Sequence, residues 1–181
     1  MRNWPTFTPN AARFMSVNDT ALAAGGFVSF RGRIEECWID ANGHMNVLGY
    51  DHMFQSAELA FFDHHGAGTG YPASGLGYFR LEKHVRHHAE LRLDEMVAVT
   101  TLLVWTDYKR VHMLHQAWNL ATGARAAVME ALSIHVDLAT RRSTPLVDPA
   151  MRVRWAETLA THDMLARPEG IGRAITVTRG A

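Results

Sequence analysis

The sequence predicts an α+β fold, an antiparallel sheet of about five strands wrapped around one long central helix. Over about 46–65, apolar residues are spaced three and four apart, which indicates one apolar helix stripe. From about 76 to 139 the apolar spacing changes to two, the period of strands. Connections between the later segments are short, so neighbouring strands are expected to be antiparallel. The helix must cover one face of that sheet to bury its stripe.

Each element follows from its local pattern. A strand over Phe27–Trp38 comes first, and the helix from Asn46 to His65 buries the stripe Val47, Tyr50, Phe54, Ala57 and Phe61. Asp148 followed by Pro149 is typical of a helix start, so a short last helix is expected to about His162. The four later strands are expected at Leu76–Leu91, Met96–Thr106, Arg110–Leu120 and Ala124–Ala139.

Length and composition indicate one domain, residues 27–165, between an N-terminal arm (1–26) and a C-terminal tail (166–181). Eighteen basic and eighteen acidic side chains cancel, so neither nucleic acid nor a membrane surface is an expected partner. No apolar run reaches the roughly 18–20 residues that cross a bilayer. A single cysteine, Cys37, excludes an intramolecular disulfide and fits a reducing compartment, so a cytoplasmic location is expected.

The segment from Ile39 to Asn46 carries the pattern most suggestive of chemistry. A carboxylate, Asp40, lies in a turn that leads into a helix, and Gly43 permits a tight backbone approach. Amides near Gly43, His44 and Met45 are expected to be unpaired and to stabilise a developing oxyanion. Asp40 would then attack a carbonyl as nucleophile or activate water as general base. The alternative is an ordinary turn or capping aspartate.

The string D-A-N-G-H-M-N-x-x-x-Y and the order of elements resemble the 4-hydroxybenzoyl-CoA thioesterase family of hotdog proteins, over about Phe27 to Pro145. The resemblance implies the hotdog fold, hydrolysis of an acyl-CoA thioester, and no cofactor beyond the coenzyme A of the substrate. It implies a homodimer or homotetramer with its sites at subunit boundaries. The residues it singles out are Asp40 as catalytic carboxylate, Gly43 and His44 in the turn receiving the thioester oxygen, Asn46 and Tyr50 on the helix's opening turn, and Glu58, an acidic position that another branch uses in catalysis.

A narrower resemblance concerns residues 82–90, 109–112 and 133–137. These segments are similar to the carnitine-catabolism branch, which includes betainyl-CoA thioesterases, and they imply a small quaternary-ammonium acyl group. Such a cation needs aromatic faces or a carboxylate. Glu58, Glu82 and His84 are the polar candidates for substrate binding; the aromatic candidates are Trp38, Tyr50, Tyr78, Trp105 and Trp118, most of which are expected in the core.

Two further expectations concern the strand after the helix and the histidines. Tyr78, Arg80, Glu82, His84, Arg86 and His88 share one parity, which favours a polar face at a subunit interface. Eleven histidines occur without an HExxH or Cys/His pattern, so no metal site is expected. Two rival functions remain: a hotdog hydratase or dehydratase, and a non-catalytic acyl-CoA-binding module.

Overall fold

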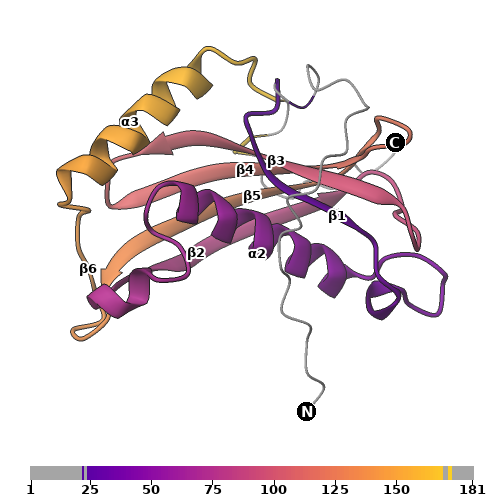
Figure 1. Ribbon diagram of the computed structural model, residues 1–181, viewed down its shortest axis with the longest axis horizontal. Helices are drawn as coiled ribbons and strands as arrows, with labels where there is room; N and C mark the ends of the chain where they lie inside the picture. Colours follow the sequence, from indigo (N-terminus) through magenta and orange to yellow (C-terminus); the bar gives the residue numbers. More distant parts are fainter. Residues whose placement is uncertain (1–21, 23, 169–170, 173–181) are drawn as a thin grey trace, which may run out of the picture.

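A curved antiparallel sheet holds one long helix, α2, against a single face (Figure 1). The computed structural model describes residues 22, 24–168 and 171–172. The strand order is β1-β3-β4-β5-β2, with the short β6 paired to β5. The elements are β1 (Phe27–Arg33), η1 (Glu36–Trp38), α2 (Val47–His64), η2 (Tyr71–Ser74), β2 (Leu76–His87), β3 (Met96–Thr106), β4 (Arg110–Asn119), β5 (Arg125–Asp137), β6 (Arg142–Ser143) and α3 (Pro149–Asp163). The predicted α+β sheet around one long helix is therefore confirmed.

The apolar stripe of α2 forms the centre of the core. Phe54, Ala57 and Phe61 are completely buried, and Tyr50 is nearly so. Val47 is 65% exposed, so its predicted place in the buried stripe is wrong. It lies in the first turn of α2.

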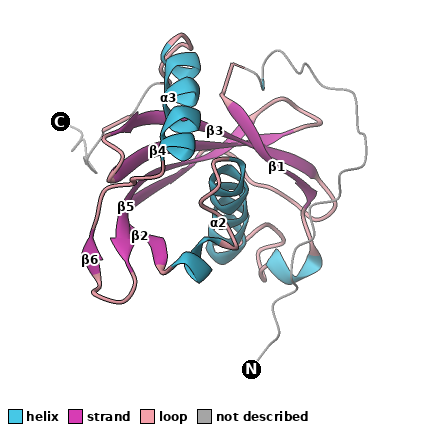
Figure 2. Cartoon of the chain, turned by 60° about the vertical axis from the view of Figure 1, so that its left-hand side comes forward, coloured by secondary structure: helices cyan, strands magenta, loops and turns pink. Residues whose placement is uncertain are grey.

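Helix α3 closes the other end of the core. Asp148 caps it by accepting a hydrogen bond from the Met151 amide, as the Asp-Pro pair predicted. Its buried Trp155 packs against Phe61 and Phe62 of α2, each with ring centroids 5.8 Å apart. Figure 2 shows α3 beside β3 and β4, above α2 in this view.

Several predicted boundaries are corrected by the structure. The first strand ends at Arg33, because Ile34 bonds to Glu95 in a loop and η1 turns Trp38 under α2. The second strand ends at His87 instead of Leu91. The two-residue β6 is too short to produce a periodic signal. Most of the expected arm and the end of the expected tail lie outside the described residues. Among the described residues, no helix combines the length and apolar character needed to cross a membrane.

Strand β2 lies at an edge of the sheet and contains an irregularity that changes which side chains face α2. Arg80 pairs with Ser133, but the next pair is Glu82 with Leu132, so Leu81 is an extra residue. A β-bulge of this kind shifts the alternation of side chains by one position. The predicted single polar face from Tyr78 to His88 is therefore split between the two faces of the sheet.

Candidate active site

Asp40 occupies a tight turn immediately before α2. Its Oδ1 accepts a 2.8 Å hydrogen bond from the Asn42 amide, and its Oδ2 accepts one of 3.2 Å from the Asn42 side chain. The hydrogen bond from the Asn42 amide is the main reason that the pKa of the Asp40 carboxyl is lowered, and the nearby His44 adds to the effect. The side chain is 30% exposed. Asp40 is therefore an ionised carboxylate that solvent and a ligand can reach.

The backbone of this turn is closed by its own hydrogen bonds. Gly43 has φ +80°, a conformation that favours glycine, and its amide donates to the Asp40 carbonyl at 3.0 Å. The Met45 amide donates to the Leu91 carbonyl at 2.7 Å. The expectation of unpaired amides is thus wrong for Gly43 and Met45, because the turn folds back on itself before the helix begins, and it stays a prediction for His44.

The free donors lie a few residues later, at the first turn of α2. Asn46 is the N-cap: its Oδ1 accepts a 3.0 Å hydrogen bond from Gly49, so this predicted substrate residue caps the helix. The first amides of a helix have no intrahelical acceptor and carry the positive end of its dipole. Those of Val47 and Leu48 belong to residues that are 65% and 59% exposed. They can therefore stabilise an anionic oxygen near Asp40.

A hollow of about 300 Å³ opens beside this helix start. His44 lies between two carboxylates, with Nδ1 3.9 Å from Asp40 Oδ1 and Nε2 3.9 Å from Glu90 Oε1. Burial raises the pKa of Tyr50 to about 12, and its hydroxyl donates to the Ala89 carbonyl at 3.2 Å. Glu90 was missed as a site residue, because only the return of the chain after β2 brings it to His44.

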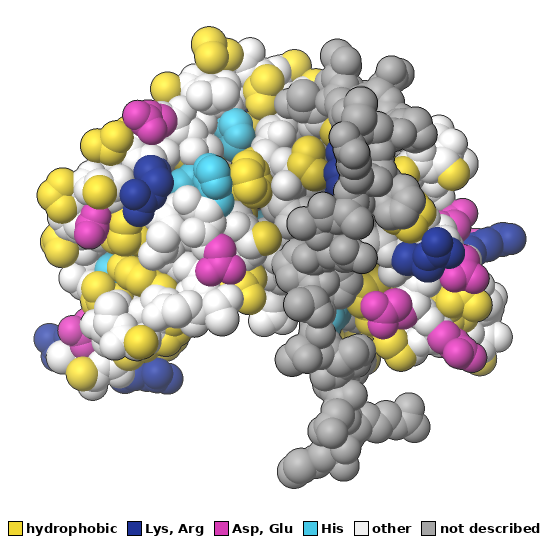
Figure 3. Space-filling model, in the orientation of Figure 1, with side chains coloured by type: hydrophobic (Ala, Val, Ile, Leu, Met, Phe, Trp, Pro, Cys, Tyr) yellow, Lys and Arg dark blue, Asp and Glu magenta, His cyan; other side chains and the backbone are white. Residues whose placement is uncertain are grey.

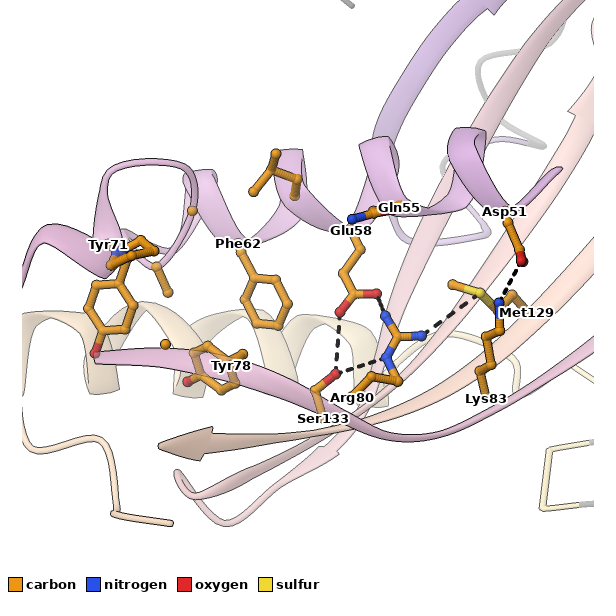
Figure 4. Close-up of a pocket in the computed structure, with 15 residues that line it drawn as sticks. Asp51, Gln55, Glu58, Phe62, Tyr71, Tyr78, Arg80, Lys83, Met129 and Ser133 are labelled. Atoms are coloured by element: carbon orange, nitrogen blue, oxygen red, sulfur yellow. Dashed lines mark hydrogen bonds and ion pairs between the residues drawn. The ribbon is translucent and has the colours of Figure 1, made fainter. Parts of the chain in front are cut away.

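A larger cavity, about 500 Å³, runs between α2 and β2. Figure 4 shows Glu58 reaching from α2 to Arg80 and Ser133, with Asp51 and Lys83 toward one end. Arg80 forms an ion pair with Glu58, and the Ser133 hydroxyl donates to Glu58 Oε1 at 3.3 Å. Lys83 and Asp51 form a second ion pair at 2.7 Å. The cavity's charged part therefore contains two carboxylates and two cations, and each carboxylate is paired with one cation.

Glu58 also borders a buried polar chain beneath α2. His115 Nε2 lies 3.8 Å from Glu58 Oε2, and His115 Nδ1 is 2.8 Å from the Thr101 hydroxyl. Burial lowers the pKa of His115 to about 3, which keeps this ring neutral at ordinary pH. The Thr101 hydroxyl contacts Ser29 at 2.7 Å. The Glu58 side chain, 9% exposed, is thus held by Arg80 and Ser133 and is far less available than that of Asp40.

Glu82 and His84 do not lie with Glu58, and their role in substrate binding stays a prediction. The bulge at Leu81 directs them to the sheet face opposite α2. There they line a separate hollow of about 330 Å³ with His112 and Glu130, whose side chains are 2.7 Å apart.

The aromatic candidates are similarly separated. Trp38 is buried in the core, Trp105 is 41% exposed beneath Arg110, and Trp118 donates to Thr100 at 3.1 Å. Tyr78 alone of these reaches the cavity beside α2. Phe62 and Tyr71, which the sequence did not single out, line it as well.

The charge distribution gives no sign of a polyanion-binding surface on the face seen in Figure 3, where basic and acidic side chains of the described residues are interspersed. No group of three or more His, Cys, Asp or Glu residues with metal-binding geometry occurs among the residues that the structure describes.

The fold, the carboxylate and the helix start together define a class of protein. The family model of the thioesterase-like superfamily matches residues 36–156, and the chain belongs to this superfamily. Two solved structures share the fold. A Staphylococcus aureus protein in complex with CoA has a TM-score of 0.76 at 24% identity, covering 82% of this chain and 94% of its own. A candidate thioesterase of Pseudomonas putida KT2440 has a TM-score of 0.73 at 27% identity, covering 85% and 98%.

The similar sequences are named for betainyl-CoA thioesterase activity. The betainyl-CoA thioesterase of Pseudomonas aeruginosa is 33% identical over 139 residues, which are 76% of this chain and 87% of that protein. The L-carnitine dehydrogenase/betainyl-CoA thioesterase of Ruegeria pomeroyi is 34% identical over 164 residues, 87% of this chain. The chain spans 32% of that longer protein and 29% of its Rhizobium meliloti counterpart, which is 30% identical.

Proposed function

We propose that this protein hydrolyses acyl-CoA thioesters at the start of α2. The observation that carries the proposal is the ionised, reachable Asp40 carboxylate beside the exposed first turn of the helix. A thioester carbonyl placed between them would meet a base or nucleophile on one side and amide donors on the other. Family membership and the thioesterase relatives support the same reaction.

The Asp40 carboxylate has two routes to the products. As a general base it takes a proton from water while the water oxygen attacks the carbonyl carbon. As a nucleophile it forms an anhydride, which water then cleaves. In both routes the C–S bond breaks and coenzyme A leaves as a thiolate, which is a good leaving group. The oxyanion formed on the way is stabilised by the amides of Val47 and Leu48. Neither route requires a metal or redox cofactor.

For the acyl group we propose a small quaternary-ammonium acid, with betainyl-CoA as the first substrate to test. Support comes from the relatives named for this substrate. A panel of betainyl-, acetyl-, benzoyl- and palmitoyl-CoA, with the released thiol measured, tests both the thioesterase reaction and the preference for a cationic acyl group. Hydrolysis of none contradicts the thioesterase function. A clear preference for benzoyl or palmitoyl contradicts the cationic acyl group alone.

The two rival functions predict different results. A hydratase or dehydratase would change the acyl chain of an enoyl- or hydroxyacyl-CoA without releasing thiol, and a binding module would retain acyl-CoA unchanged. Mass spectrometry of the acyl-CoA after incubation separates all three. The paired state of Glu58 and the open state of Asp40 favour hydrolysis.

We also propose that the chain forms a homodimer or homotetramer through β2. This strand is 12 residues long, and among the described residues its ladder partner is β5 on one side only. A long unpaired edge strand can pair with the same strand of a second copy of the chain. Light scattering at micromolar concentration should give at least twice the chain mass. A monomeric mass contradicts this proposal.

A further inference from the structure

The cavity between α2 and β2 has two chemically different parts. Its charged part contains the Glu58–Arg80 and Asp51–Lys83 ion pairs. Its other end, which we call the aromatic end, is formed by Phe62 of α2, Tyr71 of η2 and Tyr78 of β2 (Figure 4). Because each carboxylate already has its cation, the charged part offers little net attraction to a further positive group.

We propose that the aromatic end binds the trimethylammonium group of the acyl chain. This inference rests on the proposed function and extends it by assigning residues to the acyl cation. A quaternary ammonium ion has no N–H to donate, so aromatic faces are its natural partners.

The three rings form one supported group. Phe62 and Tyr78 are stacked with centroids 4.6 Å apart, and Tyr71 and Tyr78 are inclined by only 28° at 6.4 Å. Trp155 backs Phe62 from α3 at 5.8 Å. Rings held in this way need little reordering when a ligand binds.

Tyr71 has a feature that strengthens its attraction for a cation. His135 Nδ1 lies 2.7 Å from the Thr144 carbonyl, which can only accept, so Nδ1 carries the proton. Burial lowers the pKa of His135, so the ring is neutral and Nε2 is an acceptor. The Tyr71 hydroxyl, 2.8 Å away, therefore donates to Nε2. Donation places more negative charge on the phenol ring, which enhances its attraction for a cation. His135 acts here as a positioning residue.

The aromatic end and Asp40 of one chain are too far apart to serve one small substrate. Fifteen residues of helix separate Val47 from Phe62, about 22 Å at the rise of an α-helix. The turn at Asp40 lies beyond one end of α2 and η2 beyond the other (Figure 1). A betainyl group reaches only about 5 Å from its carbonyl carbon.

A second copy of the chain can bring an aromatic end close to Asp40. Antiparallel pairing of two β2 edges about a two-fold axis places the His87 end of one strand beside the Leu76 end of the other. The Asp40 region adjoins the first end, through the His87–Glu90 hollow, and the aromatic end adjoins the second. Each aromatic end therefore serves the Asp40 of the other copy.

The first experiment compares betainyl-CoA with 3,3-dimethylbutanoyl-CoA, in which carbon replaces the quaternary nitrogen. For the wild-type protein we expect kcat/KM to favour betainyl-CoA by roughly tenfold to a few hundredfold. Tyr71→Leu and Tyr78→Leu should each reduce this ratio by about tenfold, and Tyr71→Phe and His135→Gln by about threefold. Trp105→Leu, an aromatic change outside the cavity, is the matched control and should leave the ratio unchanged.

A binding measurement separates this inference from the proposed function. Choline and its neutral isostere 3,3-dimethylbutan-1-ol are titrated by calorimetry into the wild-type protein and the two leucine variants. Choline should bind the wild-type protein more tightly, and the variants should lose that difference. Preferential choline binding without any thioester hydrolysis sinks the proposed function and leaves this site standing. Hydrolysis with a wild-type substrate ratio in folded leucine variants sinks this site and leaves the function standing. Tyr71→Phe, the mildest change, decides the matter if a leucine variant unfolds.

Complementation tests the contribution of the second copy. Asp40→Asn and Tyr71→Leu/Tyr78→Leu chains are co-expressed with different tags, and the mixed dimer is purified on both. One of its two sites then combines an intact Asp40 with an intact aromatic end. We expect about half the wild-type kcat/KM for betainyl-CoA, against about 1% for the Asp40→Asn parent dimer and about a tenth or less for the aromatic-end parent dimer. A mixed dimer no more active than its parents overturns the inference.

Discussion

Asp40 and Glu58 are both carboxylates near α2, but they are prepared for different tasks. Asp40 is 30% exposed and accepts hydrogen bonds from a single turn, so it is ionised and free on its solvent side. The Glu58 side chain is 9% exposed, carries an ion pair with Arg80 and accepts a hydrogen bond from Ser133. The difference teaches that availability, more than the presence of an acid, separates a reacting group from a structural one.

Asp40→Asn is the most direct test of the different roles of the two carboxylates. The side chain keeps its shape but loses the negative charge that activates water or attacks the carbonyl. We expect turnover to fall by roughly 100-fold or more with an unchanged melting temperature. Asp94→Asn, an exposed acid paired with Arg33, is the control and should retain activity. Unchanged turnover in a folded Asp40→Asn protein would transfer the reaction to Glu58 or another acid.

Val47→Pro tests the amide at the start of α2 that we assign as an oxyanion donor. Proline is accepted at the first helical position, and the extended conformation of Asn46 (φ −76°, ψ 166°) suits a following proline. The change removes the amide donor, so kcat should fall by about 10- to 100-fold while the circular dichroism spectrum stays the same. Val47→Ala keeps the amide and should behave as wild type. Equal rates for the proline and alanine variants would exclude this amide as an oxyanion donor.

Glu58→Gln should act on stability more than on chemistry. It leaves Arg80 without its anion, so we expect the free energy of unfolding in urea to decrease by about 1–3 kcal/mol. Turnover of the folded protein should change by less than tenfold. The double variant Glu58→Gln/Arg80→Met removes both charges and should recover part of the lost stability. A Glu58→Gln protein of wild-type stability with a 100-fold lower turnover would reverse the roles assigned to the two acids.

A related contrast, between buried histidines and the exposed Asp40, should appear in the pH dependence of stability. Burial lowers the pKa of His115 to about 3 and that of His65 to about 4, from the ordinary 6.5. Below pH 6.5 the unfolded chain binds protons at these positions and the folded chain does not, so stability present above 6.5 is lost on acidification. Each histidine contributes a slope of at most about 1.4 kcal/mol per pH unit. Asp40 contributes none in this range, because its pKa is lowered from 3.8 and its own loss begins only below that value.

Urea denaturation at pH 6.5, 5.5 and 4.5 measures this slope. His115→Gln should be less stable than wild type at pH 6.5 but should lose less on acidification. Parallel profiles for the two proteins would show that His115 is protonated in the fold.

Periodicity and local turn chemistry determined much of this protein from the sequence alone. The spacing of Tyr50, Phe54, Ala57 and Phe61 fixed α2 to within a residue or two, and Met96–Thr106 was predicted with its observed bounds. Asp148 and Pro149 marked the start of α3. These signals survive in the sequence because they depend on residues a few positions apart.

The tertiary structure alone decided which polar groups meet. Tyr71 contacts His135 across 64 positions, and Ser133 contacts Glu58 across 75, so no local pattern could reveal either pair. The single extra residue at Leu81 sent Glu82 and His84 to the opposite face, because one inserted residue reverses the alternation of a strand. Closure of the turn likewise pairs the Gly43 and Met45 amides, which leaves the first turn of α2 to supply the donors. The sequence determined the elements through short-range periodicity, whereas the site depends on long-range pairing and register, which only the folded sheet specifies.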